Sequence, residues 1–151
     1  MSDVFTKAKR SEVMSRIRSR GNQATEIALV KLLRRNKITG WRRHFEIREV
    51  EGEKRKFKVR PDFVFHKSRT AIFVDGCFWH GCPKHGTQPA GNRAFWKRKF
   101  ARNLARDRLV NRVLRRANWQ VLRIWEHELS RNNEKRLLRR IHKALHGRSR
   151  K

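Results

Sequence analysis

The densest group of chemically reactive side chains lies in residues 75–85, which read DGCFWHGCPKH. This stretch holds both cysteines of the chain, one of its four aspartates and two histidines, with two aromatic residues among them. A packed hydrophobic core needs no such mixture, whereas metal chemistry beside a nucleic acid would explain it. The stretch therefore indicates a metal site, and the elements around it must position the ligands.

Three residues of this stretch have a spacing typical of zinc ligands. Cys77, Cys82 and His85 form the pattern Cys-x4-Cys-x2-His, which can occupy three corners of a Zn²⁺ tetrahedron. His127 follows the apolar run WQVLRIWE and is the candidate for the fourth corner; four protein ligands predict a structural site. The alternative is that both cysteines are plain buried residues, because a single Cys-x4-Cys pair is not very specific.

Asp62 and Asp75 are candidates for a second, oxygen-rich metal site. They lie in two β-rich runs, KFKVRPDFVF and TAIFVDG, whose polar connection predicts a hairpin. If Phe65 pairs with Ile72, Asp62 lies opposite Asp75 with both side chains on the same face. Two such carboxylates repel unless a divalent cation lies between them, and Mg²⁺ favours such sites. The alternative is that each aspartate bonds local backbone at a turn or strand end.

His80 lies between the two cysteines but does not fit their ligand spacing. An ordinary histidine pKa near 6.5 allows the side chain to accept a proton from water at neutral pH, as a metal-dependent nuclease requires. A spare ligand or a packed imidazole fits the spacing equally well. The neighbouring Phe78 and Trp79 either belong to the core, as most aromatic residues do, or stack between DNA bases.

The composition of the chain indicates a folded protein that binds nucleic acid. Its 151 residues suit one compact domain, and 41 Lys and Arg against 13 Asp and Glu give a formal net charge of +28. Such an excess favours a polyanionic partner, with affinity that falls steeply as salt rises. Five Trp, nine Phe and 37% hydrophobic residues provide a core and argue against a disordered polycation.

The targeting signals that we looked for are absent from the sequence. No apolar run approaches the roughly 20 residues of a membrane span, and the N-terminus has no apolar signal-peptide region. We therefore expect a cytosolic protein without a membrane partner.

The N-terminal half predicts two helices followed by a strand pair. Residues 9–20 predict a basic helix that orders on contact with phosphates and ends at Gly21, with Asn22 as the N-cap of a second helix. Residues 41–50 and 56–65 predict two strands, and the second forms the hairpin with the run TAIFVDG. We divide the chain into a DNA-clamping segment (1–21), a main domain (22–146) and a basic tail (147–151).

The C-terminal half predicts a helix, a strand and a helix. The first helix runs from about Asn92 to Ala117, and the buried strand WQVLRIWE follows it. The last helix spans residues 133–145 and has one apolar face. The side chains predicted to face inward from the first helix are Phe100, Leu104, Val110 and Leu114.

Four separated motifs resemble the very short patch repair endonucleases. They read RPDFV, VDGCFWHGCPKHG, NRAFWKRKFARNLARDR and WQVLRIWEHEL, and with their surroundings they cover residues 7–129. The resemblance implies an α/β fold with a restriction-endonuclease-like PD-(D/E)xK core, a mixed sheet flanked by helices and a structural zinc site. It also implies Mg²⁺-dependent nicking on the 5′ side of the T in T:G mismatches left by deamination of 5-methylcytosine.

The same resemblance implies roles for the residues that could do this chemistry. Asp62 resembles the main Mg²⁺ ligand, assisted by the backbone carbonyl of Val74, and His80 resembles the proton-accepting histidine. Asp75 stands where the family has a histidine, which implies a place in the site but leaves direct metal ligation open.

Supporting residues are implied as well. Glu26 and Asp107 resemble carboxylates that support the active site, and Phe78, Trp79 and Trp96 resemble aromatic residues that intercalate beside the mismatch. The implied partner is T:G-mismatched double-stranded DNA, bound by a monomer, with accessory repair proteins as further candidates. The implied zinc ligands are Cys77, Cys82, His85 and His127.

Two other functions remain open at this stage. One is a zinc-stabilised DNA-binding module without catalysis, although such a module has little reason to hold Asp62, Asp75 and His80 together. The other is a restriction-type nuclease of the same fold that cuts matched DNA. Cys77 replaces in position the lysine of the common nuclease motif, which favours the repair family.

Overall fold

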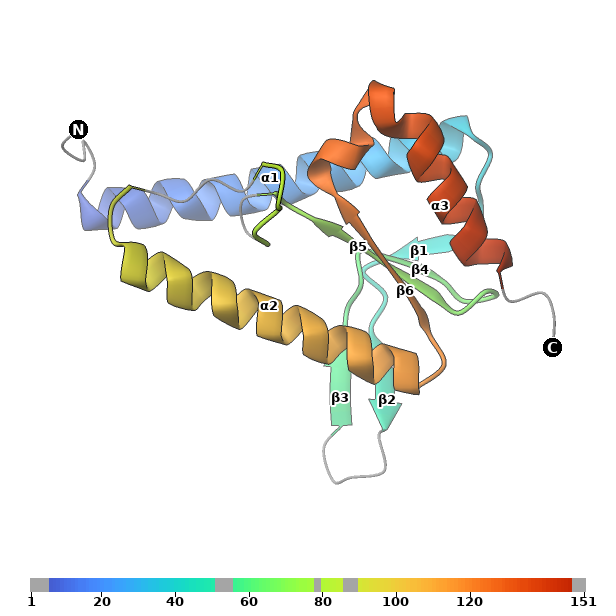
Figure 1. Cartoon of the computed structure of the whole chain (residues 1–151). Helices are drawn as coiled ribbons and strands as arrows, with labels where there is room; N and C mark the ends of the chain where they lie inside the picture. Colours follow the sequence, from blue (N-terminus) through green and yellow to red (C-terminus); the bar gives the residue numbers. More distant parts are fainter. Residues whose placement is uncertain (1–5, 51–55, 78–79, 86–89, 148–151) are drawn as a thin grey trace.

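A four-stranded mixed sheet with helices on both faces forms the centre of the molecule (Figure 1). The computed structural model describes residues 6–50, 56–77, 80–85 and 90–147. The sheet has the order β1-β4-β5-β6, in which only the β5–β6 pair is parallel. This arrangement confirms the mixed α/β architecture that the sequence predicts. The strands are β1 (Trp41–Arg43), β4 (Phe63–Phe65), β5 (Thr70–Asp75) and β6 (Gln120–Trp125).

Helices α1 (Lys7–Arg35) and α3 (Glu134–His146) cover one face of this sheet (Figure 1). Leu29 and Leu33 of α1 and Ile141 of α3 are completely buried, together with Phe63 and Ile72 of the sheet. The strand side chains alternate between the two faces, so this larger core forms from one half of them. The expected last helix is thereby confirmed, with its apolar face inward.

Helix α2 (Arg93–Arg116) covers the opposite face and connects the two parallel strands, as a parallel pair requires. Leu114 packs here with Val64, Ala71 and Trp119. The prediction that Leu104 faces inward is wrong, because its side chain is 41% exposed. The 24-residue helix is about 36 Å long, whereas a six-residue strand spans about 20 Å, so much of α2 extends past the sheet.

The predicted break at Gly21 is wrong, since α1 is one continuous helix of 29 residues. Its N-cap is Thr6, whose hydroxyl accepts a hydrogen bond from the Lys9 N–H at 3.4 Å. A single glycine costs a helix only about 1 kcal/mol relative to alanine, so it weakens the helix without ending it. The boundary between clamping segment and main domain therefore falls within a regular element.

Each of the two long predicted strands is broken into two. β2 (Ile47–Val50) and β3 (Lys56–Val59) form a separate two-stranded sheet, which extends beyond α2 in Figure 1. His44 lies at one break with a φ of 51°, an uncommon conformation for a residue other than glycine. The other break contains Asp62, whose carbonyl accepts a hydrogen bond from the His44 N–H at 3.2 Å.

The β4–β5 hairpin is confirmed, but its register differs from the assumed one by two residues. Phe65 pairs with Thr70 and Phe63 with Ile72, so the prediction that Asp62 lies directly opposite Asp75 is wrong. The cause is the short connection, in which the Arg69 N–H donates to the His66 carbonyl at 3.1 Å. A shift of two residues leaves every side chain on its expected face.

The chain after β6 turns through two short 3₁₀ helices, η1 (Glu126–Leu129) and η2 (Arg131–Asn133), before α3 begins. His127 lies in the first of them, directly after the strand, where the sequence places it. Within the described residues, every helix is too short or too polar to cross a membrane.

Candidate active site and metal cluster

Asp62 lies in an acidic group built from three separate elements. Its Oδ2 accepts a hydrogen bond from the Val74 N–H of β5 at 2.7 Å. Glu26 of α1, His44 after β1 and Asp62 each bring one potential ligand atom within 4.8 Å of the others. Glu26 Oε2 also lies 2.6 Å from the Arg43 guanidinium and 2.8 Å from His44 Nε2. The sequence analysis found Asp62 and Glu26 but missed Arg43 and His44.

The environment of Asp62 disfavours a bare negative charge. Burial and, to a smaller extent, the neighbouring Glu26 carboxylate together raise the pKa of Asp62 to about 6, against the opposing hydrogen bond from Val74. A divalent cation would stabilise two carboxylates held this close, because it compensates both desolvation and mutual repulsion. The donor set thus fits a bound cation, whereas a lone strand-end aspartate would not show this electrostatic strain.

His80 lies between two carboxylates on the α2 side of the sheet. Its Nδ1 is 2.7 Å from Asp107 Oδ2, and its Nε2 is 3.8 Å from Asp75 Oδ1. Asp107 comes from α2, Asp75 ends β5, and His80 lies in the loop between these elements. A hydrogen bond donated by Nδ1 to Asp107 leaves the Nε2 lone pair available to accept a proton.

The two carboxylates also control the ionisation of this imidazole. Burial of His80 disfavours its charged form, but the Asp107 hydrogen bond and the charges of Asp75 and Asp107 outweigh it and raise the pKa of His80 above its ordinary value. Burial would raise the pKa of Asp107, but His80 and Arg123 outweigh it and hold the pKa of Asp107 below its usual range. The pair is therefore arranged to accept a proton at His80 while Asp107 stays ionised.

Asp75 faces an arginine rather than the Asp62 carboxylate. Arg123 of β6 donates from one guanidinium nitrogen to Asp75 Oδ1 at 2.8 Å and Oδ2 at 3.0 Å. Burial raises the pKa of Asp75 above its ordinary value, although Arg123 and His80 oppose this shift. The hypothesis of one cation between Asp62 and Asp75 therefore loses its geometric basis, because the cation beside Asp75 is a side chain of the protein.

The sequence analysis did not single out Arg123, although the sequence contains a signal for it. WQVLRIWE is an apolar run with one arginine in its middle, and a charge inside a buried strand is stable only when it is paired. In the structure its partners are Asp75 of the neighbouring strand β5 and Asp107 of α2.

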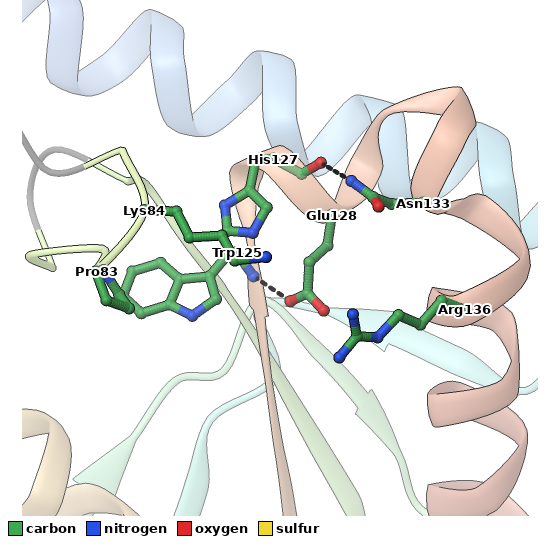
Figure 2. Close-up of a pocket in the computed structure, with 7 residues that line it drawn as sticks. All are labelled: Pro83, Lys84, Trp125, His127, Glu128, Asn133 and Arg136. Carbon is green, nitrogen blue, oxygen red and sulfur yellow. Dashed lines mark hydrogen bonds between the residues drawn. The ribbon is translucent and has the colours of Figure 1, made fainter.

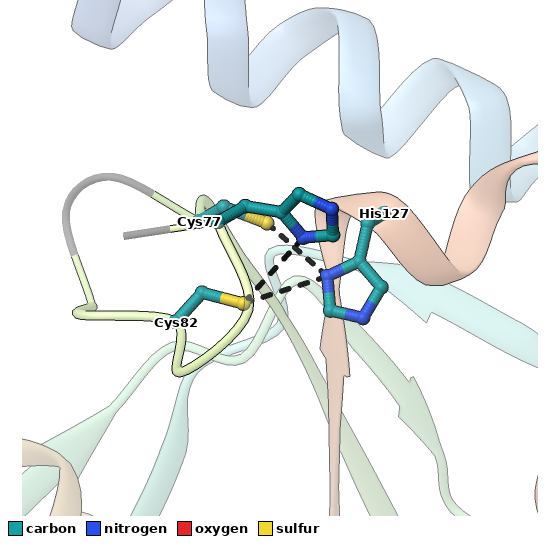
Figure 3. A group of neighbouring side chains, drawn as sticks. Cys77, Cys82 and His127 are labelled. Carbon is teal, nitrogen blue, oxygen red and sulfur yellow. Dashed lines mark hydrogen bonds between the residues drawn. The ribbon is translucent and has the colours of Figure 1, made fainter. Parts of the chain in front are cut away.

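The predicted zinc ligands come together in one place. Figure 3 shows Cys77, Cys82 and His127 converging from the loop after β5 and from η1. His127 Nδ1 lies 3.4 Å from Cys77 Sγ and 3.5 Å from Cys82 Sγ, and His85 Nδ1 lies 3.9 Å from Cys82 Sγ. Tetrahedral Zn²⁺, with bonds of roughly 2.3 Å to sulfur and 2.0 Å to nitrogen, places its S and N ligands about 3.5 Å apart.

All four ligand atoms lie within 4.8 Å of one another, so the set fits a tetrahedral metal. Such a group with no ion would gather two thiols and two imidazoles that make only weak hydrogen bonds to each other. The group uses residues 77, 82 and 85 from one loop and residue 127 from beyond β6. A metal bound there would tie the loop after β5 to the chain that leaves the neighbouring parallel strand β6 at the same end of the sheet.

A cavity of about 190 Å³ lies behind the metal cluster, on the side of α3 (Figure 2). In it, the Asn133 side-chain amide donates to the His127 carbonyl at 3.0 Å, and Glu128 accepts from the Trp125 N–H at 2.9 Å. These bonds fix the backbone that carries His127.

Of the three aromatic residues expected to intercalate, Phe78 and Trp79 lie outside the described residues. Trp96 is only 7% exposed and packs against Phe95 and Phe100, so it is not presented as an exposed wedge. Phe95 is 45% exposed at the start of α2. The helix turn that buries one ring of the Phe95–Trp96 pair exposes the other, and the sequence alone did not distinguish them.

The fold and these two sites define a class: a basic α/β protein with an acidic, histidine-containing site at a strand edge and an adjoining Cys/His cluster. The family model of DNA mismatch endonuclease Vsr matches residues 2–85, more than half of the chain. The chain therefore belongs to the DNA mismatch endonuclease Vsr family. Its sequence motifs predict the same family, and the expectation of an endodeoxyribonuclease is confirmed.

Individual relatives agree with this assignment. The chain is 44% identical over 107 residues to the type II nicking enzyme V.NaeI of Lentzea aerocolonigenes, covering 71% of this chain but less than two thirds (62%) of that protein. It is 37% identical over 136 residues to the DNA mismatch endonuclease Vsr of Escherichia coli K12, covering 89% and 80%. The type II nicking enzyme V.NmeAIP of Neisseria meningitidis is 33% identical and matches over its full length.

Proposed function

We propose that this protein nicks double-stranded DNA at T:G mismatches, hydrolysing the phosphodiester on the 5′ side of the T. Such mismatches arise by deamination of 5-methylcytosine. The observation that carries the proposal is the oriented His80–Asp107 pair, 2.7 Å apart, in the same site region as the Asp62 group. The printed names of the relatives, a mismatch endonuclease and nicking enzymes, support mismatch recognition and single-strand cleavage.

Asp62 is the residue that would hold Mg²⁺, with Glu26 nearby and the Val74 carbonyl as a further ligand. The cation, when bound, supplies stabilisation of the charge that develops on the phosphate and the leaving oxygen. The raised pKa of Asp62 supports this assignment, since Arg43 pairs with Glu26 and a bound cation would stabilise the ionised form of Asp62. Asp75 is proposed to position neighbouring side chains instead of binding the cation, because its carboxylate is paired with Arg123.

His80 is the general base in this proposal. Its Nε2 accepts a proton from the attacking water while Nδ1 remains bonded to Asp107, which stabilises the imidazolium that forms. The hydrogen bond to Asp107 fixes both the tautomer and the orientation of the imidazole. Water attacks the phosphate directly, so no covalent intermediate is needed. Positioned bases of this kind contribute roughly 10²- to 10⁴-fold in rate.

The Cys77, Cys82, His85 and His127 cluster is proposed to hold a structural Zn²⁺. Its four-ligand set leaves no open position for water, which argues against a catalytic metal there. The sheet order with the acidic group at a hairpin also supports the PD-(D/E)xK type of core. Zinc and magnesium would then have separate tasks in two separate groups of residues.

Contacts with DNA are proposed for the basic N-terminal half of α1, the basic tail and the aromatic residues. Phe78 and Trp79 would insert beside the mismatch, where the stack is cheaper to open than in matched DNA. Trp96 could do so only by leaving its packing against Phe95 and Phe100, so Phe95 is the better candidate on α2. The protein would act as a monomer on bacterial nucleoid DNA in the cytoplasm, with accessory repair proteins as possible partners.

The proposal is tested with end-labelled duplexes that carry one T:G mismatch in several flanking contexts. Matched T:A and C:G duplexes and an EDTA reaction are the controls. Cleavage of one strand 5′ to the mismatched T, dependent on Mg²⁺, is the expected result. Cutting of matched duplexes would instead identify a restriction-type nuclease, and binding without cutting would leave a DNA-binding module.

A further inference from the structure

Arg123 closes a ring of four side chains, the other three being Asp75, Asp107 and the His80 imidazole. One guanidinium nitrogen lies 2.8 Å from Asp75 Oδ1, and the other lies 3.3 Å from Asp107 Oδ1. Asp107 and Asp75 in turn flank His80, at 2.7 Å from Nδ1 and 3.8 Å from Nε2. One arginine therefore contacts both carboxylates that compete for one histidine.

The two sides of this competition are unequal. Asp107 hydrogen-bonds His80, whereas the distance from Asp75 Oδ1 to Nε2 is about 1 Å longer than that of a typical hydrogen bond. Asp75 is 5% exposed, so little water can solvate its charge and the carboxylate must find a partner within the protein. The nearest alternative partner to Arg123 is Nε2, the nitrogen that has to face the attacking water.

The guanidinium itself is held rigidly, as this task requires. Its Nε donates to Asn111 Oδ1 at 3.0 Å, and its plane lies over the Phe73 ring at 4.5 Å from the centroid. Arg140 donates to the Arg123 backbone carbonyl at 2.9 Å, fixing the strand from the α3 side. Asp75 thus meets a donor whose position is set by three other elements.

We propose that Arg123 is a positioning residue that withholds the Asp75 carboxylate from His80 Nε2 and so keeps this nitrogen free for water. The inference rests on the proposed function in taking His80 as the base. Without the guanidinium, the buried Asp75 carboxylate turns to Nε2 and clamps the imidazole between two acids. The arginine then acts through orientation, without touching the reacting atoms.

The kinetic test compares single-turnover nicking by Arg123→Gln, by the double variant Asp75→Asn/Arg123→Gln and by the wild type. Arg123→Gln should lower the nicking rate by about 10²-fold while changing the Kd for DNA by no more than about two-fold. The double variant should recover most of that rate, since an amide competes weakly for Nε2. A double variant as slow as Arg123→Gln, or Arg123→Gln at wild-type rate, overturns the proposal.

A control variant removes the same charge from a different ion pair. Arg35 pairs with Glu134 at 2.7 Å between α1 and α3, so Arg35→Gln deletes one arginine and one ion pair without reaching the ring. Its nicking rate should equal that of the wild type. Should Arg123→Gln fail to fold, which circular dichroism reports, the double variant compared with Asp75→Asn still decides: the two should nick at equal rates.

A crystal structure of Arg123→Gln separates this inference from the proposed function. The His80 Nε2 to Asp75 Oδ1 distance, 3.8 Å with the arginine present, should shorten to about 2.8 Å. An unchanged distance overturns the withholding role even if the enzyme is slow. A shortened distance in a protein that nicks no T:G duplex supports the ring and rejects only the proposed activity.

Discussion

The Cys/His cluster and the carboxylate site of Asp62 and Glu26 differ in how complete they are. The cluster already has its S and N atoms at spacings that a tetrahedral metal requires, 3.4 and 3.5 Å around His127 Nδ1. In the carboxylate site the negative charge of Asp62 is poorly compensated, since burial and the nearby Glu26 raise the pKa of Asp62 to about 6. A metal bound at the cluster would therefore stabilise the fold, whereas the ionised Asp62 carboxylate lowers the stability of the folded chain.

The loop of residues 75–85 carries both cysteines of the cluster and also His80. Among its described residues, the His80 N–H donates to the Gly76 carbonyl at 3.2 Å and the Cys82 N–H donates to the Cys77 carbonyl at 3.0 Å. His80 lies between the two cysteines, so a metal that ties Cys77 and Cys82 to His127 would also restrain His80. With His80 as the proposed base, a metal bound at the cluster would add to the restraint on the imidazole.

The largest effect should follow from breaking the cluster. Cys82→Ser removes a buried ligand, and we expect the free energy of unfolding to fall by more than about 4 kcal/mol because folding is coupled to the metal. Thermal unfolding and zinc content by mass spectrometry measure this. One zinc per wild-type chain and none in the variant is expected; equal stability of the two would reduce the cluster to a packed thiol group.

Breaking the other site should abolish most of the catalysis while the chain still folds. Asp62→Asn should lower the nicking rate about 10³-fold or more, equivalent to about 4 kcal/mol in the barrier, while DNA binding is kept. The reason is that the variant removes the main cation ligand and leaves the shape of the site intact. Gel-shift and nicking assays on the same T:G duplex provide the measurement, and an active Asp62→Asn enzyme would contradict the mechanism.

The same variant should be more stable than the wild type at neutral pH. The pKa of Asp62 is about 6 in the folded chain and near 3.8 when unperturbed, so the folded state binds this proton more tightly. The stabilisation is complete below the unfolded pKa and is lost as pH rises through about 6, a loss of roughly 1–3 kcal/mol at pH 7. Urea unfolding at pH 4 and pH 7 without Mg²⁺ measures it.

Asp62→Asn should show none of this pH-dependent loss, which isolates the contribution of the carboxylate from all other groups. Addition of Mg²⁺ should restore stability to the wild type alone, because the cation compensates the charge. A wild-type chain whose stability follows that of the variant across this pH range would show that the site is not strained.

The smallest effect is expected at an exposed position of α2. Leu104 is 41% exposed on α2, so Leu104→Gln should change the free energy of unfolding by less than about 0.5 kcal/mol. Leu114→Ala on the same helix removes a fully buried side chain and should cost about 2–5 kcal/mol. Urea unfolding of this pair calibrates the other measurements; equal losses would mean that the outer half of α2 is packed.

Several features of the fold followed from local pattern alone. The helix at residues 93–116, the strand at 120–125 and the helix at 134–146 have strong apolar periodicity and were predicted within a few residues. The hairpin turn was recognisable from its polar residues. Gly21 misled the prediction because a glycine only weakens a helix, and the continuation of α1 is decided by the whole element.

The zinc candidates were visible in the sequence because three of them are close in the chain, at positions 77, 82 and 85. His127 could be proposed only as the histidine at the end of the next buried strand, since a parallel strand brings its end beside that of its neighbour. Arg43, His44 and Arg123 were missed because each acts through a partner far away in the sequence.

The sequence by itself determined the residue types available for chemistry, the basic surface and the order of helices and strands, because these depend on composition and short-range spacing. Only the tertiary structure decided which carboxylate faces which cation. A register shift of two residues preserves every hydrophobic face, so the apolar pattern cannot choose between the two pairings. In the observed register Asp62 is not opposite Asp75. Asp75 instead pairs with Arg123, which lies 48 residues further along the chain.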